Sequence, residues 1–509
     1  MQDTPQSVPG PSSAAQSQNP DPRIPLRERY ISDENPKSPW TKKTVLTFDG
    51  GGIRGYSSLL ILKALMLKIM EIEANAGYYC SSDYPWMAAG TQKEEYATVN
   101  NLEGFSLVII LTTLQELPRE GRLRMTVNDA LRQYKEFGNE IFGKARWWNE
   151  RSLFWFPRAK YSSTKTRTIF PQIISEKMIR DGLKISEYYM SIEPFMYDED
   201  RTRTIAFSYY MNKKSGISNV VYLWRTYDHY NADRAESPAY RPLNPSSAHT
   251  VPIWQVARAT SAAPTYFESI KLGNEKHLDG GMGANNPSLH TLREVVSKHG
   301  HAPDRVPALF VSIGCGKRTA PNEAQHEVNV QVEPAAIDRG RRKQGLKKWA
   351  ELGRGWKDFL TDTEGPIGFD GWNNLCDLLK VPRCRFNVEG QMTRIPLDCW
   401  IPSTSNGGIL ERIRIEIDNY LSMDSTQGKL EAMARELVNI RHRRARTVRW
   451  ERFATEFIYR CSSEECQQHP STYKSREEFR HHLTSSGIHP RMEDSDLEDK
   501  LDSGRELAA

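Results

Sequence analysis

The sequence predicts a layered α/β fold, because strand-like and helix-like runs alternate along much of the chain. The run at 44–48 is apolar and strand-like, a glycine-rich turn follows at 49–55, and residues 56–70 favour a helix. The same alternation returns later, with a helix-like run at 253–263 and a short apolar strand at 308–313. Helices in such a chain are expected to flank the sheet.

Between these regions we expect a helix and then two strands. Residues 126–137 have a helical pattern of apolar side chains. The runs 204–211 and 220–226 are rich in aromatic and β-branched residues, which favour strands, and their closeness in the sequence suggests a hairpin. Asp279 ends a further short strand, immediately before Gly280 and Gly281.

Composition and charge exclude several classes of protein. The 509 residues include 69 basic and 64 acidic side chains, a balance too even to indicate nucleic-acid binding. No apolar run reaches the length of a membrane span, and the N-terminus lacks the pattern of a secretory signal. Seven cysteines without a repeated framework fit a reducing compartment. We therefore expect an intracellular protein, cytoplasmic or peripheral on membranes.

Shifts in composition divide the chain into five expected parts. Residues 1–40 are polar and rich in proline and serine, which predicts a disordered tail. The other four parts are the α/β domain at 44–315, a charged and helix-prone region at 316–455, a candidate zinc-finger-like segment at 456–492 and an acidic, disordered tail at 493–509.

The glycine-rich turn is typical of an anion-binding site. Glycines at 50, 51, 52 and 55 let backbone N–H groups approach a negative oxygen, and the start of the following helix adds partial positive charge. That oxygen could belong to a phosphate or to a tetrahedral acyl intermediate. The turn alone does not distinguish the two.

A dinucleotide-binding module is one alternative, because Gly50, Gly52 and Gly55 satisfy the G-x-G-x-x-G pattern. However, the acidic residues at the expected spacing, Glu71 and Glu73, lie inside the helix-like run and not at the end of a second strand. A tight turn without any ligand is the other alternative.

Two further motifs accompany the turn. They are VARATSAAPTYF at 256–267 and HLDGGMGANNP at 277–287. With the turn at 49–55, they make the chain resemble the patatin-like phospholipase family, in the form common in fungi, over residues 44–315. The resemblance implies a lipid acyl hydrolase that contacts a membrane surface transiently and needs no cofactor for catalysis.

The resemblance also implies site residues. The glycine turn, Gly50, Gly51 and Gly52 with Arg54 and Gly55 beside it, would be the oxyanion hole. Asp279, in the motif Asp279-Gly280-Gly281, would be the base of a Ser–Asp dyad. A carboxylate can activate a serine if partial burial raises its pKa, and a position between an apolar strand and a Gly-Gly turn suits this role. The alternative is an ordinary turn aspartate.

The nucleophile that this family requires is missing from the sequence as written. The family places its serine in a Gly-x-Ser-x-Gly elbow between the glycine turn and the aspartate. The nearest match surrounds Ser106, in Gly-Phe-Ser-Leu-Val, where Val108 replaces the last glycine. A β-branched residue is poorly suited to that elbow, so Ser106 is a weak candidate.

A shifted reading frame restores the elbow. Residues 106–121, SLVIILTTLQELPREG, can be back-translated with allowed codons so that the shifted frame reads PCHYFDYIAGTSTGG. That segment contains Gly-Thr-Ser-Thr-Gly, and its serine triplet straddles the codons of Leu117 and Pro118. We therefore hypothesise that residues 106–121 are the nucleophile segment read in the wrong frame. The chain as written is expected to have impaired activity.

The C-terminal part carries a candidate metal site. Cys461, Cys466, His482 and His489 are separated by four, fifteen and six residues, which resembles a degenerate two-Cys, two-His zinc finger. His469 and His481 are spare candidates, and the alternative is a polar tail with incidental cysteine and histidine.

Three functions are therefore compared. The first is a patatin-like serine lipid acyl hydrolase, impaired in this chain by the missing elbow. The second is a catalytically inactive protein that binds lipid or a protein partner. The third is a nucleotide-binding module that uses the glycine turn, and the Asp-Gly-Gly motif argues against it.

Overall fold

The computed structural model describes most of the predicted core. The described residues are 38–75, 127–144, 159–180, 203–211, 220–229, 243–299 without 248 and 265, 306–317, 363–402, 407–445, and 457–507 without 464–465, 467–471, 474, 486 and 488. The tail at 1–37 and the stretch 106–121, with Ser106, lie outside these residues.

A parallel sheet carries the glycine turn at its edge. Its strands are β1 (Thr44–Phe48), β6 (Leu309–Ile313) and β7 (Arg383–Phe386), in the order β1-β6-β7. Every residue of β1 and β6 is buried, as expected for parallel strands covered on both faces. In the described part of the chain, the second edge of β1 has no partner strand.

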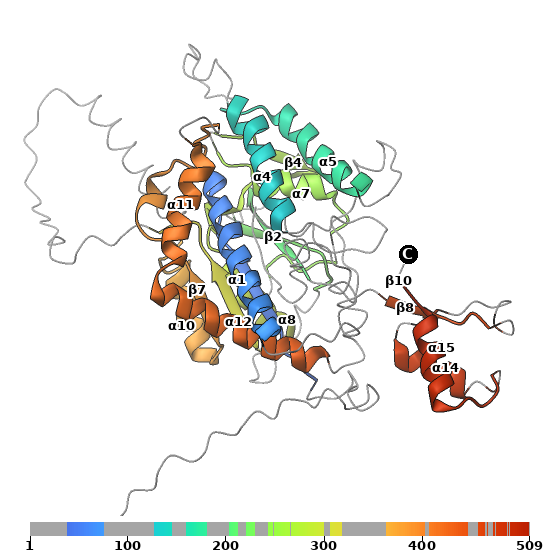
Figure 1. Cartoon of the computed structure of the whole chain (residues 1–509). Coiled ribbons are helices and arrows are strands. Elements are labelled where there is room, and N and C mark those ends of the chain that lie inside the picture. The colour runs from blue at the N-terminus through green and yellow to red at the C-terminus, as the bar shows by residue number, and fades with distance from the viewer. Residues whose placement is uncertain are drawn as a thin grey trace, which may run out of the picture.

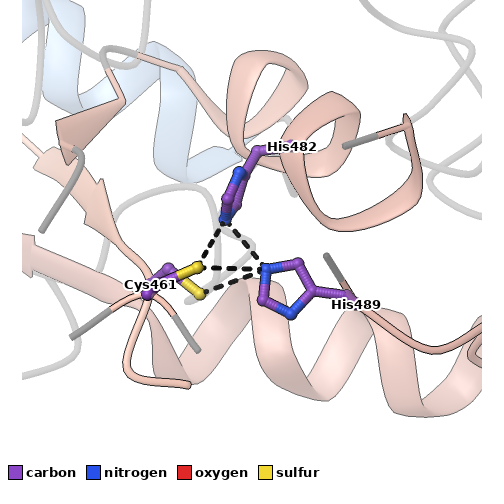
Figure 2. A group of neighbouring side chains, drawn as sticks. Cys461, His482 and His489 are labelled. Carbon is purple, nitrogen blue, oxygen red and sulfur yellow. Dashed lines mark hydrogen bonds between the residues drawn. The ribbon is translucent and has the colours of Figure 1, made fainter. Parts of the chain in front are cut away.

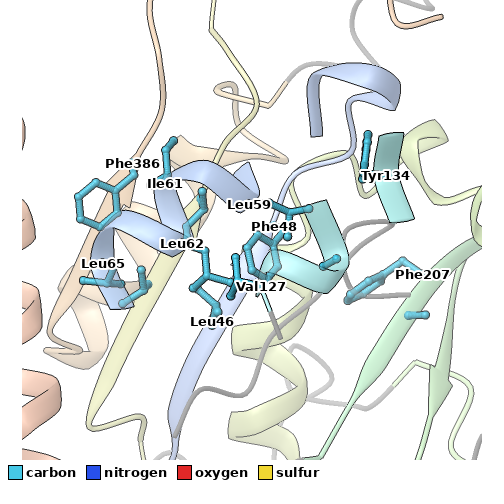
Figure 3. Packing of buried hydrophobic residues seen from close by; sticks show 14 of the residues in the cluster. Leu46, Phe48, Leu59, Ile61, Leu62, Leu65, Val127, Tyr134, Phe207 and Phe386 are labelled. Atoms are coloured by element: carbon cyan, nitrogen blue, oxygen red, sulfur yellow. The ribbon is translucent and has the colours of Figure 1, made fainter. Parts of the chain in front are cut away.

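Helices cover both faces of this sheet (Figure 1). The helices are α1 (Gly55–Asn75), α11 (Ile409–Leu421) and α12 (Asp424–Ala445) on one face, and α8 (Ser288–His299) and α10 (Phe369–Leu379) on the other. Leu46 and Phe48 join the large apolar core that includes α1, as Figure 3 shows, whereas Val45 packs with α8 and α10. This alternation follows from the two-residue period of a strand.

A second, antiparallel sheet carries the aspartate. Its strands, in the order β3-β2-β5-β4, are β3 (Val220–Arg225), β2 (Ile205–Met211), β5 (Glu275–Asp279) and β4 (Ile270–Leu272). The predicted hairpin of β2 and β3 is confirmed. The helix α7 (Ile253–Thr260) packs on β2 and β5, and α4 (Val127–Ile141) and α5 (Ser163–Arg180) complete this side.

The boundary expected at residue 315 does not separate two cores. The region 316–455, predicted to be helical, supplies β7 to the parallel sheet, and its helices α11 and α12 pack on α1. The N-terminal tail also ends earlier than predicted, because Trp40 is buried and Arg444 lies over its ring.

The prediction of a disordered acidic tail at 493–509 is wrong for its described part. The C-terminal unit contains β8 (Phe457–Arg460), β9 (Thr472–Tyr473), α14 (Arg476–Ser485), α15 (Asp494–Ser503) and β10 (Arg505–Leu507). Leu497 and Leu501 of α15 are buried against a small core, and acidic side chains of α15 pair with Arg476. The apolar and ionic contacts together order this helix.

None of the helices in the described part of the chain is long and apolar enough to cross a membrane.

Candidate active site

The glycine turn takes its shape from contacts with distant segments. It leaves the C-terminal end of β1, where the Asp49 N–H still donates to the Ile313 carbonyl at 3.0 Å. Gly52 has a φ of 55°, and a Cβ at this position would lie 2.2 Å from the carbonyl oxygen of Leu397. Both the left-handed conformation and the close approach require glycine there.

Two neighbouring N–H groups of the turn have no acceptor among the described residues. The Gly50 N–H donates to the Asn285 carbonyl at 2.7 Å, and the Ile53 N–H donates to the Leu397 carbonyl at 2.8 Å. By contrast, none of the described residues accepts a hydrogen bond from the N–H of Gly51 or Gly52. The short helix Gly52–Arg54 and then α1 begin here, so the partial positive charge of a helix N-terminus adds to both groups.

Arg54 adds a full positive charge beside the turn. The Cβ position at Gly51 lies 3.6 Å from the Arg54 Cβ. The Arg54 Nε is buried, and no described residue forms a hydrogen bond with it. The turn is therefore suited to a negative oxygen.

Asp279 is held by the two motifs of the later sequence. It is the last residue of β5, and its N–H donates to the Ala262 carbonyl at 3.1 Å. Its Oδ1 accepts a hydrogen bond of 2.7 Å from the Gly281 N–H. A Cβ at Gly280 would lie 2.4 Å from the Phe207 carbonyl oxygen, so the chain can turn there only with glycine. The motif at 256–267 thus fixes the backbone of the aspartate.

The environment of Asp279 favours the protonated form more than water does. Burial raises the pKa of its carboxyl from 3.8 to about 6, and the Gly281 N–H opposes this shift only in part. The residue keeps intermediate exposure, so its carboxylate is shielded without being sealed off. No basic side chain in the described part of the chain forms an ion pair with it. A carboxyl with this pKa is mostly ionised at neutral pH and can accept a proton.

Asn285 brings the two motifs together. Its carbonyl accepts the Gly50 N–H, and its Oδ1 lies 2.6 Å from the Cβ position of Gly50. The same Oδ1 lies 3.2 Å from the Cβ position of Gly281. The glycine turn and the Asp-Gly-Gly turn therefore face each other across one asparagine. The sequence motif included Asn285, but nothing in the pattern indicated this role.

A buried ion pair holds Asp49, the first residue of the glycine turn. The sequence alone did not predict this ion pair. The Asp49 carboxylate, at 0% side-chain exposure, receives Arg385 Nη1 at 3.2 Å and Nη2 at 2.6 Å. Arg385, on β7, also pairs with Glu364 and donates to the Ser312 Oγ at 2.7 Å. Arg385 lies 336 residues from Asp49 in the sequence, so only the fold brings them together.

Cys315 is a buried thiol that contacts the turn. Its Sγ donates to the Gly50 carbonyl at 3.1 Å and lies 2.2 Å from the Cβ position of Gly51. Burial raises the pKa of its thiol to about 11, so the thiolate is scarce at neutral pH. The Cys315 thiol packs against Gly51, and its raised pKa disfavours a role as nucleophile.

The acidic residues considered for a dinucleotide site are engaged elsewhere. Glu73 is buried in α1 and pairs with Arg441 of α12 at 2.7 Å. Glu71 pairs with Lys68 on the same helix at 2.7 Å. Glu73 thus holds two helices together, which weakens the dinucleotide interpretation.

In the C-terminal unit, the four predicted metal ligands converge. The ligand atoms of Cys461, Cys466, His482 and His489 all lie within 4.8 Å of one another (Figure 2). Both cysteines are buried and both histidines are partly buried. Of the spare candidates, His481 is exposed on α14, and His469 lies outside the described residues.

Comparison with known proteins identifies the class of domain. The family model described as patatin-like phospholipase matches residues 121–291. The chain therefore contains a patatin-like phospholipase domain, as the three motifs predicted. The match begins at Gly121, the residue at which the stretch 106–121 ends.

Individual relatives are distant in sequence. The chain is 24% identical over 276 residues to calcium-independent phospholipase A2-gamma of Homo sapiens, which covers 54% of this chain and 28% of the relative. It is 24% identical over 323 residues to patatin-like protein 4 of Arabidopsis thaliana, covering 60% and 65%. It is 29% identical over 182 residues to the 85/88 kDa calcium-independent phospholipase A2 of Mus musculus, covering 33% and 21%. The matched part thus spans less than two thirds of each relative.

Proposed function

We propose that the gene encodes a serine lipid acyl hydrolase in which Asp279 is the base and the N–H groups of Gly51 and Gly52 form the oxyanion hole. The juxtaposition of the two turns across Asn285 carries this proposal, because it places the turn of a shielded carboxylate beside two N–H donors that have no acceptor among the described residues. The patatin-like domain and the phospholipase names of the relatives support a lipid ester as the substrate.

The proposed reaction proceeds in two steps. A serine hydroxyl loses its proton to Asp279 and attacks the ester carbonyl, and the oxyanion accepts hydrogen bonds from Gly51 and Gly52. Protonated Asp279 then gives its proton to the departing alcohol, which leaves an acyl-enzyme. Water attacks the acyl-enzyme with Asp279 again as base, and the fatty acid and the free serine are released. Arg54 adds positive potential near the oxyanion, and no metal takes part.

We further propose that the serine belongs to the frame-shifted segment at 106–121. Two observations support this. The family match begins only at Gly121. In addition, β1 is buried along its whole length, yet among described residues it pairs on one edge only. An unpaired buried strand edge is costly, and the shifted segment is expected to supply a central strand and the start of the nucleophile helix.

Sequencing of genomic DNA and transcript across codons 100–130 tests the frame. A transcript that encodes Gly-Thr-Ser-Thr-Gly would support the proposal. Genomic DNA that cannot encode the shifted segment in any frame would refute it. Such a refutation would favour the alternative function, a catalytically inactive protein that binds lipid or a protein partner.

The chemistry is tested separately on the protein that the transcript encodes. Release of fatty acid from phospholipid vesicles is compared for the wild type, Asp279→Asn and Asp370→Asn. The asparagine at 279 keeps an Oδ1 for the Gly281 N–H, so the turn can persist without the base. Loss of a member of a catalytic unit should lower kcat by about 10⁴-fold, whereas exposed Asp370 should tolerate the change. Equal activity of both variants would exclude Asp279 as the base.

A further inference from the structure

The C-terminal unit, residues 457–507, shares no hydrogen bond with the active site among described residues and has chemistry of its own. Four side chains of the two residue types that prefer zinc converge within it. We propose that Cys461, Cys466, His482 and His489 bind one Zn²⁺ ion in a closed, four-coordinate structural site.

The local fold presents these ligands from four separate points. Cys461 directly follows β8, and Cys466 lies in the connection from β8 to β9. His482 projects from the last turn of α14, and His489 comes from the segment between α14 and α15. Figure 2 shows both imidazole rings directed toward the sulfur atoms. An ion held here would tie the three-stranded sheet, β10-β8-β9, to helix α14.

The distances between the donor atoms fit a tetrahedral ion. Zn–S bonds of about 2.3 Å and Zn–N bonds of about 2.0–2.1 Å give tetrahedral edges of roughly 3.3–3.8 Å. The Cys466 Sγ lies 3.4 Å from the Nε2 of both His482 and His489, and the Cys461 Sγ lies 3.7 Å from the His489 Nε2. The two Nε2 atoms are 2.9 Å apart, so a small separation would accommodate the ion.

The hydrogen bonds between the four side chains are weaker than the bonds that an ion would form with them. Two imidazole Nε2 atoms face each other, and only one of them can donate its proton to the other. Both thiols are buried, at 5% and 6% exposure, where hydrogen bonds of sulfur are weak compensation. Thiolate and imidazole are borderline-soft ligands, which suit zinc and disfavour magnesium and calcium.

The size of the unit also calls for a metal. Its apolar core consists of a few side chains around Tyr459, Phe479 and Leu483, with Leu497 and Leu501 from α15. The rings of Tyr459 and Tyr473 stack on Phe479, and Tyr473 stacks on His482 at 4.7 Å. A unit of about 50 residues with such a core usually needs a metal or a disulfide for stability. Zinc binding would then contribute directly to folding.

The surface of α14 argues for a structural role and against nucleic-acid recognition. Arg476 pairs with Glu498 and Asp502, and Arg480 also pairs with Glu498, so α15 occupies the basic side chains of α14. Residues 457–507 contain eleven acidic and seven basic residues. Both features oppose contact with phosphates.

Metal analysis of the purified full chain tests the site. After saturation with Zn²⁺ and removal of free metal, the wild type should retain about one ion per chain, and Co²⁺ should give the visible absorption of a tetrahedral thiolate complex. His482→Ala should lose the ion, whereas His481→Ala, at the exposed neighbouring position, should retain it. His482→Cys should also retain it, because a Cys₃His site still binds zinc.

The variants also separate loss of the site from general unfolding. If His482→Ala merely unfolds the unit, the wild-type Co²⁺ spectrum and the rescue by His482→Cys still report on the site. A wild-type chain that retains no zinc, or His481→Ala losing as much zinc as His482→Ala, would overturn the proposal.

Discussion

Replacing Arg385 by methionine should destabilise the protein strongly, although this residue lies outside the family motifs. The substitution keeps a long apolar stem but removes the guanidinium that neutralises Asp49 and donates to Ser312. The Asp49 carboxylate would remain at 0% exposure without a partner. Removing one partner of a buried ion pair typically costs about 3–5 kcal/mol of the free energy of unfolding.

The cost should depend on pH in a defined direction. Burial already raises the pKa of Asp49 from 3.8 to about 6, against the influence of Arg385, so loss of the arginine should raise it further. The folded state therefore holds this proton more tightly than the unfolded chain. Stability conferred by the proton is present at low pH and is lost as the pH rises through the folded-state pKa. The variant should thus be closer to wild type at pH 5 than at pH 8.

Arg383→Met provides the matched control on the same strand. Arg383 pairs with Asp377, which is 63% exposed, and a pair of this kind contributes about 1 kcal/mol or less. Urea denaturation can be followed through the fluorescence of buried Trp372 at both pH values. Equal costs for the two variants, or a cost for Arg385→Met that does not change with pH, would refute the role assigned to the buried pair.

Three further predictions concern the active site. In the protein that the transcript encodes, vesicle hydrolysis should rise as the pH increases through about 6, because Asp279, the proposed base, can accept a proton only when it is ionised. A flat profile from pH 5 to 8 would contradict this proposal. Gly52→Ala should lower the free energy of unfolding by more than about 1 kcal/mol, because the φ of Gly52 is positive and an added Cβ would meet Leu397. Urea denaturation measures this change. Gly428→Ala is the control and should not destabilise, because Gly428 lies inside α12 with open space around its Cβ position. Hydrogen exchange of the β1 amides should be compared between the chain as written and the protein that the transcript encodes. Some of these amides should be protected only in the transcript-encoded protein, where an added strand would pair with them. Identical exchange in both proteins would argue against the added strand.

Local patterns predicted the elements that carry the motifs. The strand, glycine turn and helix at 44–70, the hairpin of β2 and β3 and the strand that ends at Asp279 all follow from short-range periodicity and turn residues. The strand β7 was missed because its sequence, Arg-Cys-Arg-Phe, has no apolar run. Its buried Arg385 is tolerated only because Asp49 and Glu364 meet it in the folded chain, and no local signal indicates such a pairing.

The lack of a local sequence signal also explains why the order of α15 and the role of Asn285 were not predicted. The acidic composition of residues 493–509 suggested disorder, but Leu497 and Leu501 recur at helical spacing and find the core of the C-terminal unit. The acidic composition gave no sign of order, because Arg476, which pairs with Glu498 of α15, lies on another helix. Asn285 acts through its main-chain carbonyl as much as through its side chain, and the position of a carbonyl is a property of the fold.

In the proposed active site, the contacts that hold the glycine turn and Asp279 in place are distinct from the serine that would attack the substrate. The glycine turn is held by Ile313, Asn285 and Leu397, and Asp279 is held by Ala262 and Gly281. Every one of these anchors lies in the described residues. The described contacts therefore fix the backbone of both turns of the proposed active site. One edge of β1 has no partner strand among the described residues. If the restored nucleophile segment pairs there, its serine should lie near the glycine turn, because parallel strands end at the same edge of a sheet and the N–H groups of Gly51 and Gly52 follow β1.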